Sequence, residues 1–515
     1  MQLPKFLHPL RNCLKNRDSI DLAMNKWFVF LGSVLLGCFV VPMHYFVSNY
    51  PQFGLQDTFF IIALFGAICL GIAGLLWLLL RDLHKVSFLL YGGSVVFWFS
   101  HPVAVFFREH SFFQRFPING YQWPLLFTCC FVSVLCLFFF LKYFPRFVET
   151  LNKTLSTFVL ILSLLLSING SHKIFSEFKR ANGIIQKHQD DKKYPNVYHI
   201  LLDAHPNPKA MQIIGGDLSG FYNELETLGF VTFPKSRSNY PATMWSVASM
   251  LDMDYLDEGW KEKPIEHFGR KIHGNKVIKR FRKEGYSDFF ATDNIMIKSL
   301  YAPSNELGGG SNNDFFMQLY CILCCTPVKH IYERCFRNLF KQAVLRAIEN
   351  VFESLESAKD THGNVANVFY AHLLCPHEPC VFGKQAENLA FSGFMMKFDT
   401  LNFIKPEVHK AYCENVYGID ELVLKTVKQI LKQYDTEPIK PIIVLHSDHS
   451  ILYNARDLES PFVTPDTVYG NLLALYIPEA WKQDAKDLKF INLYRWIFNH
   501  LFSDKYEYFK ENLQK

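Results

Sequence analysis

Five long apolar stretches in the first third of the chain constrain its fold more than any other feature. About 20 helical residues are enough to cross the roughly 30 Å hydrocarbon core of a bilayer. Four of the five stretches come close to or reach that length, and the fifth is the shortest. A Ser-His-Pro run in the third predicts a kink there. We therefore expect five transmembrane helices near residues 27–46, 59–80, 86–107, 124–141 and 155–166.

The basic residues between these stretches predict how the chain is oriented. Lys and Arg in short loops favour the cytoplasmic side of a membrane. Five of them precede the first span, the next loop (47–58) has none, and Arg81 and Lys85 follow the second span. Arg108 and Arg115 depart from this pattern on the loop expected outside. An odd number of spans then places the C-terminal domain outside the cytoplasm.

The charge of the chain gives no indication of a nucleic-acid partner. Its 515 residues carry a net charge of only +5, and the Lys and Arg residues are scattered rather than clustered. Binding to nucleic acid usually requires a basic patch or stripe. We expect an integral membrane protein without a nucleic-acid partner, and the sequence leaves its oligomeric state open.

The chain divides into three regions by composition. We expect a transmembrane region over 1–170, a polar, Lys-rich juxtamembrane linker over 171–194, and a soluble domain over 195–515. In the soluble domain, short apolar runs alternate with helical patterns, which is typical of an α/β fold with helices on both faces of a mostly parallel sheet.

Three of these runs lead into acidic or imidazole side chains. The run 197–202 ends at Asp203, 367–371 ends at His372, and 442–445 leads into His446 and the residues after it. Ligands of open α/β sheets bind just beyond the carboxyl ends of the strands. The pattern therefore predicts a site at this edge of the sheet.

Two carboxylates and three imidazoles form the candidate site. Singly, Asp203 suits a helix cap, Asp448 a turn, and His449 a satisfied buried histidine. Together with His372 and His377 they supply a set of ligands suited to Zn²⁺ or Mn²⁺. We expect a divalent metal as cofactor.

A hydroxyl nucleophile is available at Thr243. Pro241 lies just before it, and small and apolar residues at helical spacing follow, so Thr243 is expected to open a helix. The positive end of a helix favours a bound oxyanion. The same position suits a plain N-cap. A Thr hydroxyl becomes an effective nucleophile only beside a base or a metal.

In order and spacing, the segment 195–203, the Thr243 segment and the Ser447-Asp448-His449 run resemble the alkaline phosphatase/sulfatase superfamily. With N-terminal spans, the chain resembles more narrowly the phosphoethanolamine transferases and lipoteichoic acid synthases of bacterial envelopes. The resemblance implies an alkaline-phosphatase-like α/β/α domain, held outside a bacterial inner membrane by a multi-pass anchor.

The resemblance also implies roles for individual residues. Asp203, Thr243, Asp448 and His449 would hold a metal, with Thr243 as the nucleophile that becomes transiently esterified. The segment 372–379 is similar to the two-histidine motif of phosphoethanolamine transferases. It would let His372 and His377 bind the substrate phosphate, bind a second metal, or act as acid and base on the leaving group.

The implied activity is transfer of a phosphate-linked head group, of phosphoethanolamine or phosphoglycerol type, from a lipid donor to an envelope lipid or glycan. A phosphodiesterase or sulfatase-like hydrolase and a non-catalytic envelope-binding protein remain alternatives. Ser450 stands where the family has Gly, and the Cys-x-Pro-Ser-Arg segment that sulfatases convert to formylglycine is absent. Formylglycine-dependent sulfatase activity is therefore disfavoured.

Overall fold

The chain forms two compact units. The computed structural model describes residues 23–49, 55–109, 136–183, 194–293, 337–361, 366–384, 406–451 and 461–510, together with 297, 305–306, 318–319, 322–323, 326 and 328. One unit comprises Met1–Ile185 and Asn313–Phe336, and the other comprises Gln186–Asn312 and Arg337–Lys515. We call them the helical unit and the α/β unit and describe each by itself.

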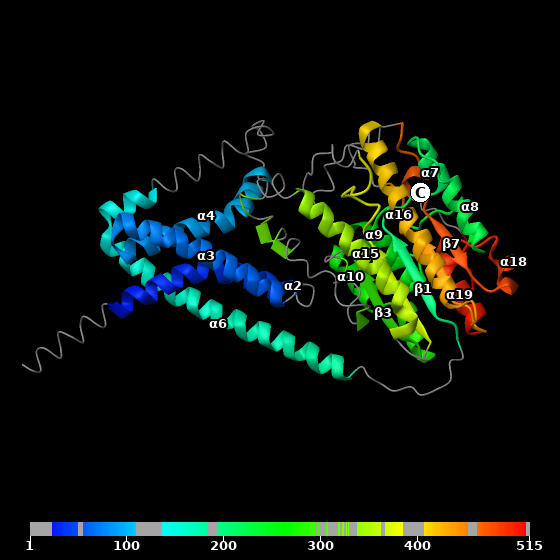
Figure 1. The fold of residues 1–515 in the computed structure, drawn as a ribbon, viewed down its shortest axis with the longest axis horizontal. Helices are drawn as coiled ribbons and strands as arrows, with labels where there is room; N and C mark the ends of the chain where they lie inside the picture. Colours follow the sequence, from blue (N-terminus) through cyan, green and yellow to red (C-terminus); the bar gives the residue numbers. More distant parts are fainter. Residues whose placement is uncertain are drawn as a thin grey trace, which may run out of the picture. The chain divides into compact units, whose positions relative to one another are not determined.

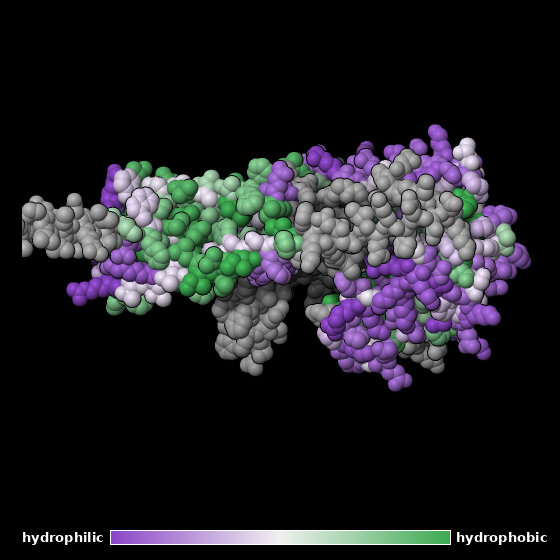
Figure 2. All heavy atoms as spheres, turned by 90° about the horizontal axis from the view of Figure 1, so that it is seen from below, coloured by the Kyte–Doolittle hydropathy of each residue, from purple (hydrophilic) through white to green (hydrophobic). Residues whose placement is uncertain are grey.

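The helical unit contains three helices long and apolar enough to cross a membrane. They are Ala23–Ser48, helix α3 (Leu55–Leu80), and Pro145–Phe175 within helix α6 (Pro145–Gly183). The first includes the π-helical turn η2 (Leu36–Val40) and most of α2 (Val41–Asn49). Large apolar side chains are exposed on these helices, for example Leu79 at 79%, and Figure 2 shows the apolar surface of this unit. Lipid would cover such side chains.

The prediction of five spans is therefore reduced to three candidates among the described residues. The third predicted segment does form a helix, α4 (Leu83–Glu109), but α4 is not among the candidates. The candidate spans come only from the residues that the structure fully describes, and the last part of α4, from residue 99 on, is not among them. The fourth predicted segment begins outside the described residues, and its described part, 136–141, is helical.

The fifth predicted segment, 155–166, was too short. Helix α6 continues on both sides of it, from Pro145 to Gly183, and so includes residues 171–183 of the expected linker. No proline follows Pro145 within the helix, and the polar residues after Gly170 are compatible with a helix. The domain boundaries at 170 and 195 stay a prediction.

Close contacts between small residues hold the helical unit together. A Cβ added at Gly32 would lie 2.8 Å from the Cα of Ser156, so only glycine allows the two backbones to approach this closely. Beside this contact the Tyr91 hydroxyl bonds to Ser156 Oγ at 2.7 Å. Polar groups buried among apolar helices need such partners.

A seven-stranded mixed sheet forms the centre of the α/β unit. Its strand order is β2-β7-β6-β1-β5-β3-β4. The pairings among β6, β1, β5, β3 and β4 are parallel, and β7 runs antiparallel to both β6 and β2. The strands are β1 (Val197–Leu202), β2 (Val231–Thr232), β3 (Ser287–Thr292), β4 (Asn305–Glu306), β5 (Asn367–Leu373), β6 (Ile442–His446) and β7 (Leu473–Tyr476).

Helices cover both faces of this sheet. Every residue of β1, β5 and β6 is buried, which is why these strands read as continuous apolar runs. Alternate residues such as Val197 and Leu201 pack in a core with helices α9 (Thr243–Asp252), α10 (Ile265–His273), α11 (Lys276–Lys283) and α19 (Leu493–Leu501). Helices α15 (Arg337–Thr361) and α16 (Pro406–Gln433) pack on each other over the other face (Figure 1). The expected α/β architecture is confirmed.

Shorter helices complete the unit. They are α7 (Pro208–Ile213), α8 (Ser219–Thr227), α17 (Pro465–Tyr469) and α18 (Lys482–Ala485), with the 3₁₀ turns η5 (Trp260–Glu262), η8 (Glu479–Trp481) and η9 (Phe490–Asn492). Because β1, β5 and β6 are parallel neighbours, their carboxyl ends meet at one edge of the sheet, and the residues that follow them converge there.

Asn196 lies just before β1 and connects the amino-terminal ends of β1, β5 and β6. Its side chain is buried, and its Oδ1 accepts a hydrogen bond from Asn367 N at 3.0 Å. Its Nδ2 donates to the Tyr434 hydroxyl at 2.6 Å, and its backbone oxygen accepts from Ile442 N at 2.9 Å. One side chain thus ties the start of β5 and the end of α16 to β1.

We predict that Asn196→Ala lowers the free energy of unfolding by about 1–3 kcal/mol, because it leaves buried polar groups without their hydrogen bonds. The thermal midpoint of the detergent-solubilised full chain would fall by several degrees. The exposed Asn223 on α8 provides the matched control, since Asn223→Ala removes no buried partner. Equal midpoints for the two variants would contradict this role of Asn196.

Candidate active site

Asp203 lies at the end of the central strand β1, where the chain turns sharply. Its side chain is 2% exposed, and its backbone N donates to Leu373 O at 2.8 Å. The next residue, Ala204, is buried with a φ of 61°, a conformation that costs a non-glycine residue about 1 kcal/mol or more. The backbone after β1 is therefore held in a strained turn beside the Asp203 carboxylate.

Asp448 and His449 follow β6, next to β1 in the sheet. Asp448 Oδ1 accepts from Ala204 N at 3.1 Å and from His449 N at 3.0 Å, so this oxygen does hold a turn. His449 Nδ1 donates to Ser450 O at 2.6 Å. A neutral imidazole with its proton on Nδ1 presents an unprotonated Nε2, and this atom lies 3.5 Å from both Asp203 Oδ1 and Asp448 Oδ2.

Thr243 is the first residue of α9 and does not cap the helix. The N-cap is Ala242, in an extended conformation and without a side-chain cap. The Thr243 Oγ1 instead lies 3.2 Å from Asp203 Oδ2 and 3.2 Å from His449 Nε2. The hydroxyl is thus directed at the acidic and imidazole groups that follow β1 and β6.

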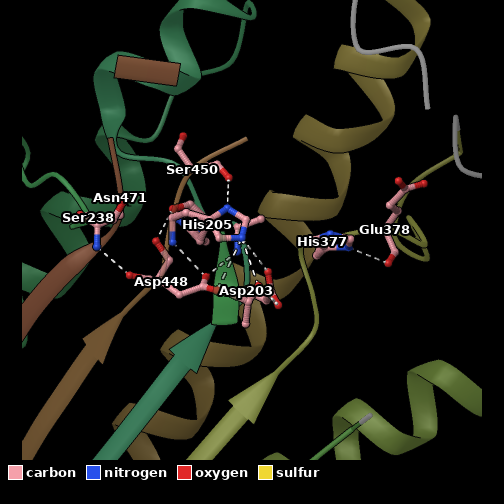
Figure 3. A network of polar contacts seen from close by, with 12 residues as sticks. Asp203, His205, Ser238, His377, Glu378, Asp448, Ser450 and Asn471 are labelled. Carbon is pink, nitrogen blue, oxygen red and sulfur yellow. Dashed lines mark hydrogen bonds and ion pairs between the residues drawn. The ribbon is translucent and has the colours of Figure 1, made fainter. Parts of the chain in front are cut away.

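His372 lies within the same cluster, whereas His377 lies beside it. His372 Nε2 is 3.6 Å from Asp203 Oδ2, and one ligand atom each from Asp203, His372 and Asp448 lies within 4.8 Å of the others. His377 donates its backbone N to Asp203 O at 3.1 Å, while its Nδ1 bonds to Glu378 O at 3.0 Å. Figure 3 shows His377 and Glu378 set apart from Asp203 and Asp448.

The side chains that the sequence singled out therefore meet at one place, except for His377. The structure joins Asp203, Thr243, Asp448 and His449, as the prediction groups them. His372 lies within reach of the same ligand atoms, as its place in the predicted set of carboxylates and imidazoles allows. The resemblance instead assigns it to the substrate phosphate, a second metal, or acid and base chemistry. The role of each residue stays a prediction.

Two oxygen atoms of this cluster favour a bound cation. Asp203 Oδ1 and Asp448 Oδ2 are buried and have no hydrogen-bond partner among the described residues. A buried carboxylate without compensation costs several kcal/mol. Carboxylate oxygens, imidazole nitrogen and a hydroxyl are ligands that suit Zn²⁺ or Mn²⁺. The residues present thus fit a divalent metal ion.

The two carboxylates differ in their proton affinity. Burial and the neighbouring charge of Asp203 raise the pKa of Asp448. Burial also opposes ionisation of Asp203, but hydrogen bonding to His372 and the nearby His377 and His449 outweigh it and lower the pKa of Asp203. Burial opposes protonation of His449, yet Asp448 and Asp203 raise its pKa. A cation beside these groups would favour both ionised carboxylates.

Supporting residues that the sequence analysis did not single out surround Ser447. Its Oγ bonds to His205 O at 2.5 Å and accepts from Leu472 N at 2.9 Å. Asn471 Nδ2 donates to Ser447 O at 2.6 Å. His205 Nε2 in turn bonds to Asp420 Oδ1 at 2.8 Å. The available signal was a His soon after the buried strand β1, but its partners, Asp420 and Ser447, lie more than 200 residues away in the sequence.

Three further polar side chains of the α/β unit have hydrogen-bond or ion-pair partners within it. Arg237 Nη2 pairs with Asp466 Oδ1 at 2.7 Å, and Asn239 Nδ2 bonds to Ser249 Oγ at 3.2 Å. Asp293 follows β3, and its Oδ1 accepts from Leu374 N at 2.8 Å. Burial raises the pKa of Asp293 to about 6.

No family model and no curated protein matches the chain. Among solved structures, the chain is similar to "Integral membrane protein lipooligosaccharide phosphoethanolamine transferase A (EptA)" from Neisseria meningitidis, with 13% identity over 92% of this chain and 95% of that chain and a TM-score of 0.39.

Two further solved structures are similar over a smaller share of the chain. The zinc complex of the C-terminal periplasmic domain of EcEptC from Escherichia coli is 13% identical over 61% of this chain and 84% of that chain, with a TM-score of 0.37. Phosphonate monoester hydrolase of Agrobacterium radiobacter is 12% identical over 60% of this chain and 74% of that chain, with a TM-score of 0.38.

We predict that Asp448→Asn weakens the zinc affinity of the purified full chain by at least about tenfold, because it removes a buried anionic ligand. Zinc content after dialysis against a weak chelator measures the effect. The exposed Asp487 offers the control, since Asp487→Asn leaves the cluster intact. If Asp448→Asn retained as much zinc as Asp487→Asn, the cluster would not be the metal site.

Proposed function

We propose that the protein is a membrane-bound, metal-dependent transferase that moves a phosphate-linked head group from a lipid donor to another envelope molecule through Thr243. The observation that carries this proposal is the position of the Thr243 hydroxyl, 3.2 Å from both Asp203 Oδ2 and His449 Nε2 at the first turn of a helix. The N-cap of this helix is Ala242, so the Thr243 hydroxyl is directed at the cluster and does not cap the helix.

The Thr243 hydroxyl donates to Asp203 Oδ2 at 3.2 Å, so this carboxylate oxygen is the group beside it that can accept its proton. His449 Nδ1 bonds to Ser450 O, so His449 Nε2, also 3.2 Å from the hydroxyl, is the nitrogen that would bind a metal. Removal of that proton makes Oγ1 nucleophilic toward phosphorus. When bound by Asp203, Asp448, His449 and His372, a divalent metal would stabilise the ionised hydroxyl and offset charge on the phosphoryl oxygens.

The start of α9 supplies a second source of stabilisation. The first backbone N–H groups of a helix have no partner within it and carry partial positive charge. Thr243 is the first residue of this ten-residue helix, so a phosphoryl group attached to its Oγ1 lies near those donors. The same groups would stabilise the negative charge that develops during attack.

His377 is the residue that we propose for the leaving group. It is half-buried, and its Nδ1 faces Glu378 O. Its backbone N bonds to Asp203 O, so the ring stays next to the cluster without joining it. We assign it proton transfer to the departing alcohol and, in the second step, proton removal from the acceptor.

The membrane helices explain why a lipid is the proposed donor. Three candidate spans anchor the chain in a bilayer, where phospholipid head groups are the most abundant phosphodiesters. Phosphoethanolamine or phosphoglycerol would pass to Thr243 and then to an envelope lipid or glycan, which gives two-step exchange kinetics. We place the α/β unit outside the inner membrane of a bacterium, in line with the basic residues before the first span.

We predict that Thr243→Ala lowers release of the head group from a fluorescent phospholipid by about 10³-fold or more, since the covalent step is lost. Thr243→Ser keeps a hydroxyl and would retain measurable turnover. The exposed Thr227 of α8 gives the control, because Thr227→Ala leaves the site unchanged. Turnover by Thr243→Ala near that of the control would exclude Thr243 as nucleophile.

A second prediction separates the transferase from a hydrolase on the same scaffold. With a labelled phosphoethanolamine or phosphoglycerol donor and an added glycolipid acceptor, we expect the label on the acceptor, because Thr243 passes the group to an alcohol. Mass spectrometry of the lipid products measures this partition. Label found only in the water-soluble phosphate ester would identify a hydrolase. A folded, zinc-loaded chain that turns over no ester would identify a binding protein.

A further inference from the structure

Two histidines and a tyrosine form a buried chain of hydrogen bonds behind the candidate metal centre. Tyr494 lies on α19, His199 on β1 and His446 on β6, and none of them is more than 1% exposed. The Tyr494 hydroxyl bonds to His199 Nδ1, and His199 Nε2 bonds to His446 Nε2. His446 Nδ1 reaches Ser447 O at 3.0 Å.

The partners of these atoms determine where each proton lies. Ser447 O is a carbonyl and only accepts, so His446 Nδ1 carries a proton. A second proton on His446 would make a buried cation, and its partners are a carbonyl and another imidazole rather than a carboxylate. His446 Nε2 therefore accepts from His199 Nε2, and His199 Nδ1 accepts from the Tyr494 hydroxyl. All donors point the same way, toward Ser447.

The end of this chain is the peptide group that precedes Asp448. Ser447 O belongs to the same planar unit as the N–H of Asp448, so holding the carbonyl also fixes the direction in which Asp448 leaves the strand. Asn471 Nδ2 holds the same carbonyl at 2.6 Å, and Leu472 O accepts from Ser447 N at 3.0 Å. The Asp448 carboxylate then reaches Ala204 N at 3.1 Å and the cluster beyond it.

We propose that Tyr494, His199 and His446 form a positioning relay that sets the metal affinity of the site by orienting Asp448 and His449. None of the three is assigned a contact with metal or substrate. The inference rests on the proposed metal centre and extends it to the C-terminal helix α19, which packs against α9, the helix that carries Thr243. Partners of this kind typically change metal affinity by about 10–100-fold.

The test measures the zinc dissociation constant of the purified full chain by competition with a chromogenic chelator. His446→Leu removes the donor to Ser447 O and should weaken zinc binding by about tenfold or more. His446→Asn keeps an N–H group on the atom that replaces Nδ1 and should restore most of that affinity. Tyr494→Phe keeps the ring but removes the hydroxyl, and should weaken binding by about threefold or more.

Tyr434 provides a matched control for the tyrosine. It is also 1% exposed, and its hydroxyl accepts from Asn196 Nδ2 at 2.6 Å at the opposite end of the strands. Tyr434→Phe should lower the thermal midpoint but leave the zinc dissociation constant within about twofold of wild type. In the double variant Tyr494→Phe/His446→Leu, the loss should equal that of His446→Leu alone, because the two residues act in series.

Three results would overturn the relay. Zinc binding by Tyr494→Phe within the range of Tyr434→Phe would show that the hydroxyl has no effect on the site, even if His446→Leu fails to fold. Equal losses in His446→Asn and His446→Leu would indicate packing rather than hydrogen bonding. A wild-type chain that binds no zinc or manganese would contradict the metal centre itself, and the relay with it.

Discussion

The buried carboxylate of Asp203 is the interaction on which the rest of the site depends. At 2% exposure it cannot keep its charge without partners, and the fold brings Thr243, His372 and His449 to within 3.2–3.6 Å of it. Even so, Asp203 Oδ1 and Asp448 Oδ2 have no hydrogen-bond partner in the part of the chain that the structure describes. A cation would satisfy both oxygens, and the same cation would activate the hydroxyl that already lies beside them.

The parallel sheet makes this concentration of charge possible. Strands β5, β1 and β6 are neighbours and end together, so single residues from three distant parts of the chain meet without long loops. Helix α9 adds Thr243 from one face of the sheet. Behind these residues, Tyr494, His199 and His446 extend the hydrogen-bond network of the site into the core, and each of the three has a hydrogen-bond partner there.

Much of this arrangement could be predicted from the sequence because strands buried on both faces read as unbroken apolar runs. The residues that end them, Asp203, His372 and Asp448, therefore stand out. His199 and His446 do not, because a polar residue inside such a run gives no sign of which neighbour it meets across the sheet. The membrane helices were less predictable: α6 extends well beyond the apolar core expected at 155–166, since polar residues also propagate a helix.

The central claim is that oxygen and nitrogen atoms of this cluster hold a metal ion against Thr243. X-ray absorption spectroscopy at the zinc edge, on the zinc-loaded full chain, tests it most directly. The account predicts a shell of only oxygen and nitrogen neighbours at about 2.0–2.2 Å. It also predicts loss of one of them in Thr243→Ala. A sulfur shell at about 2.3 Å would instead place the metal at cysteines, such as the buried Cys375, Cys380 or Cys413, and would contradict the account.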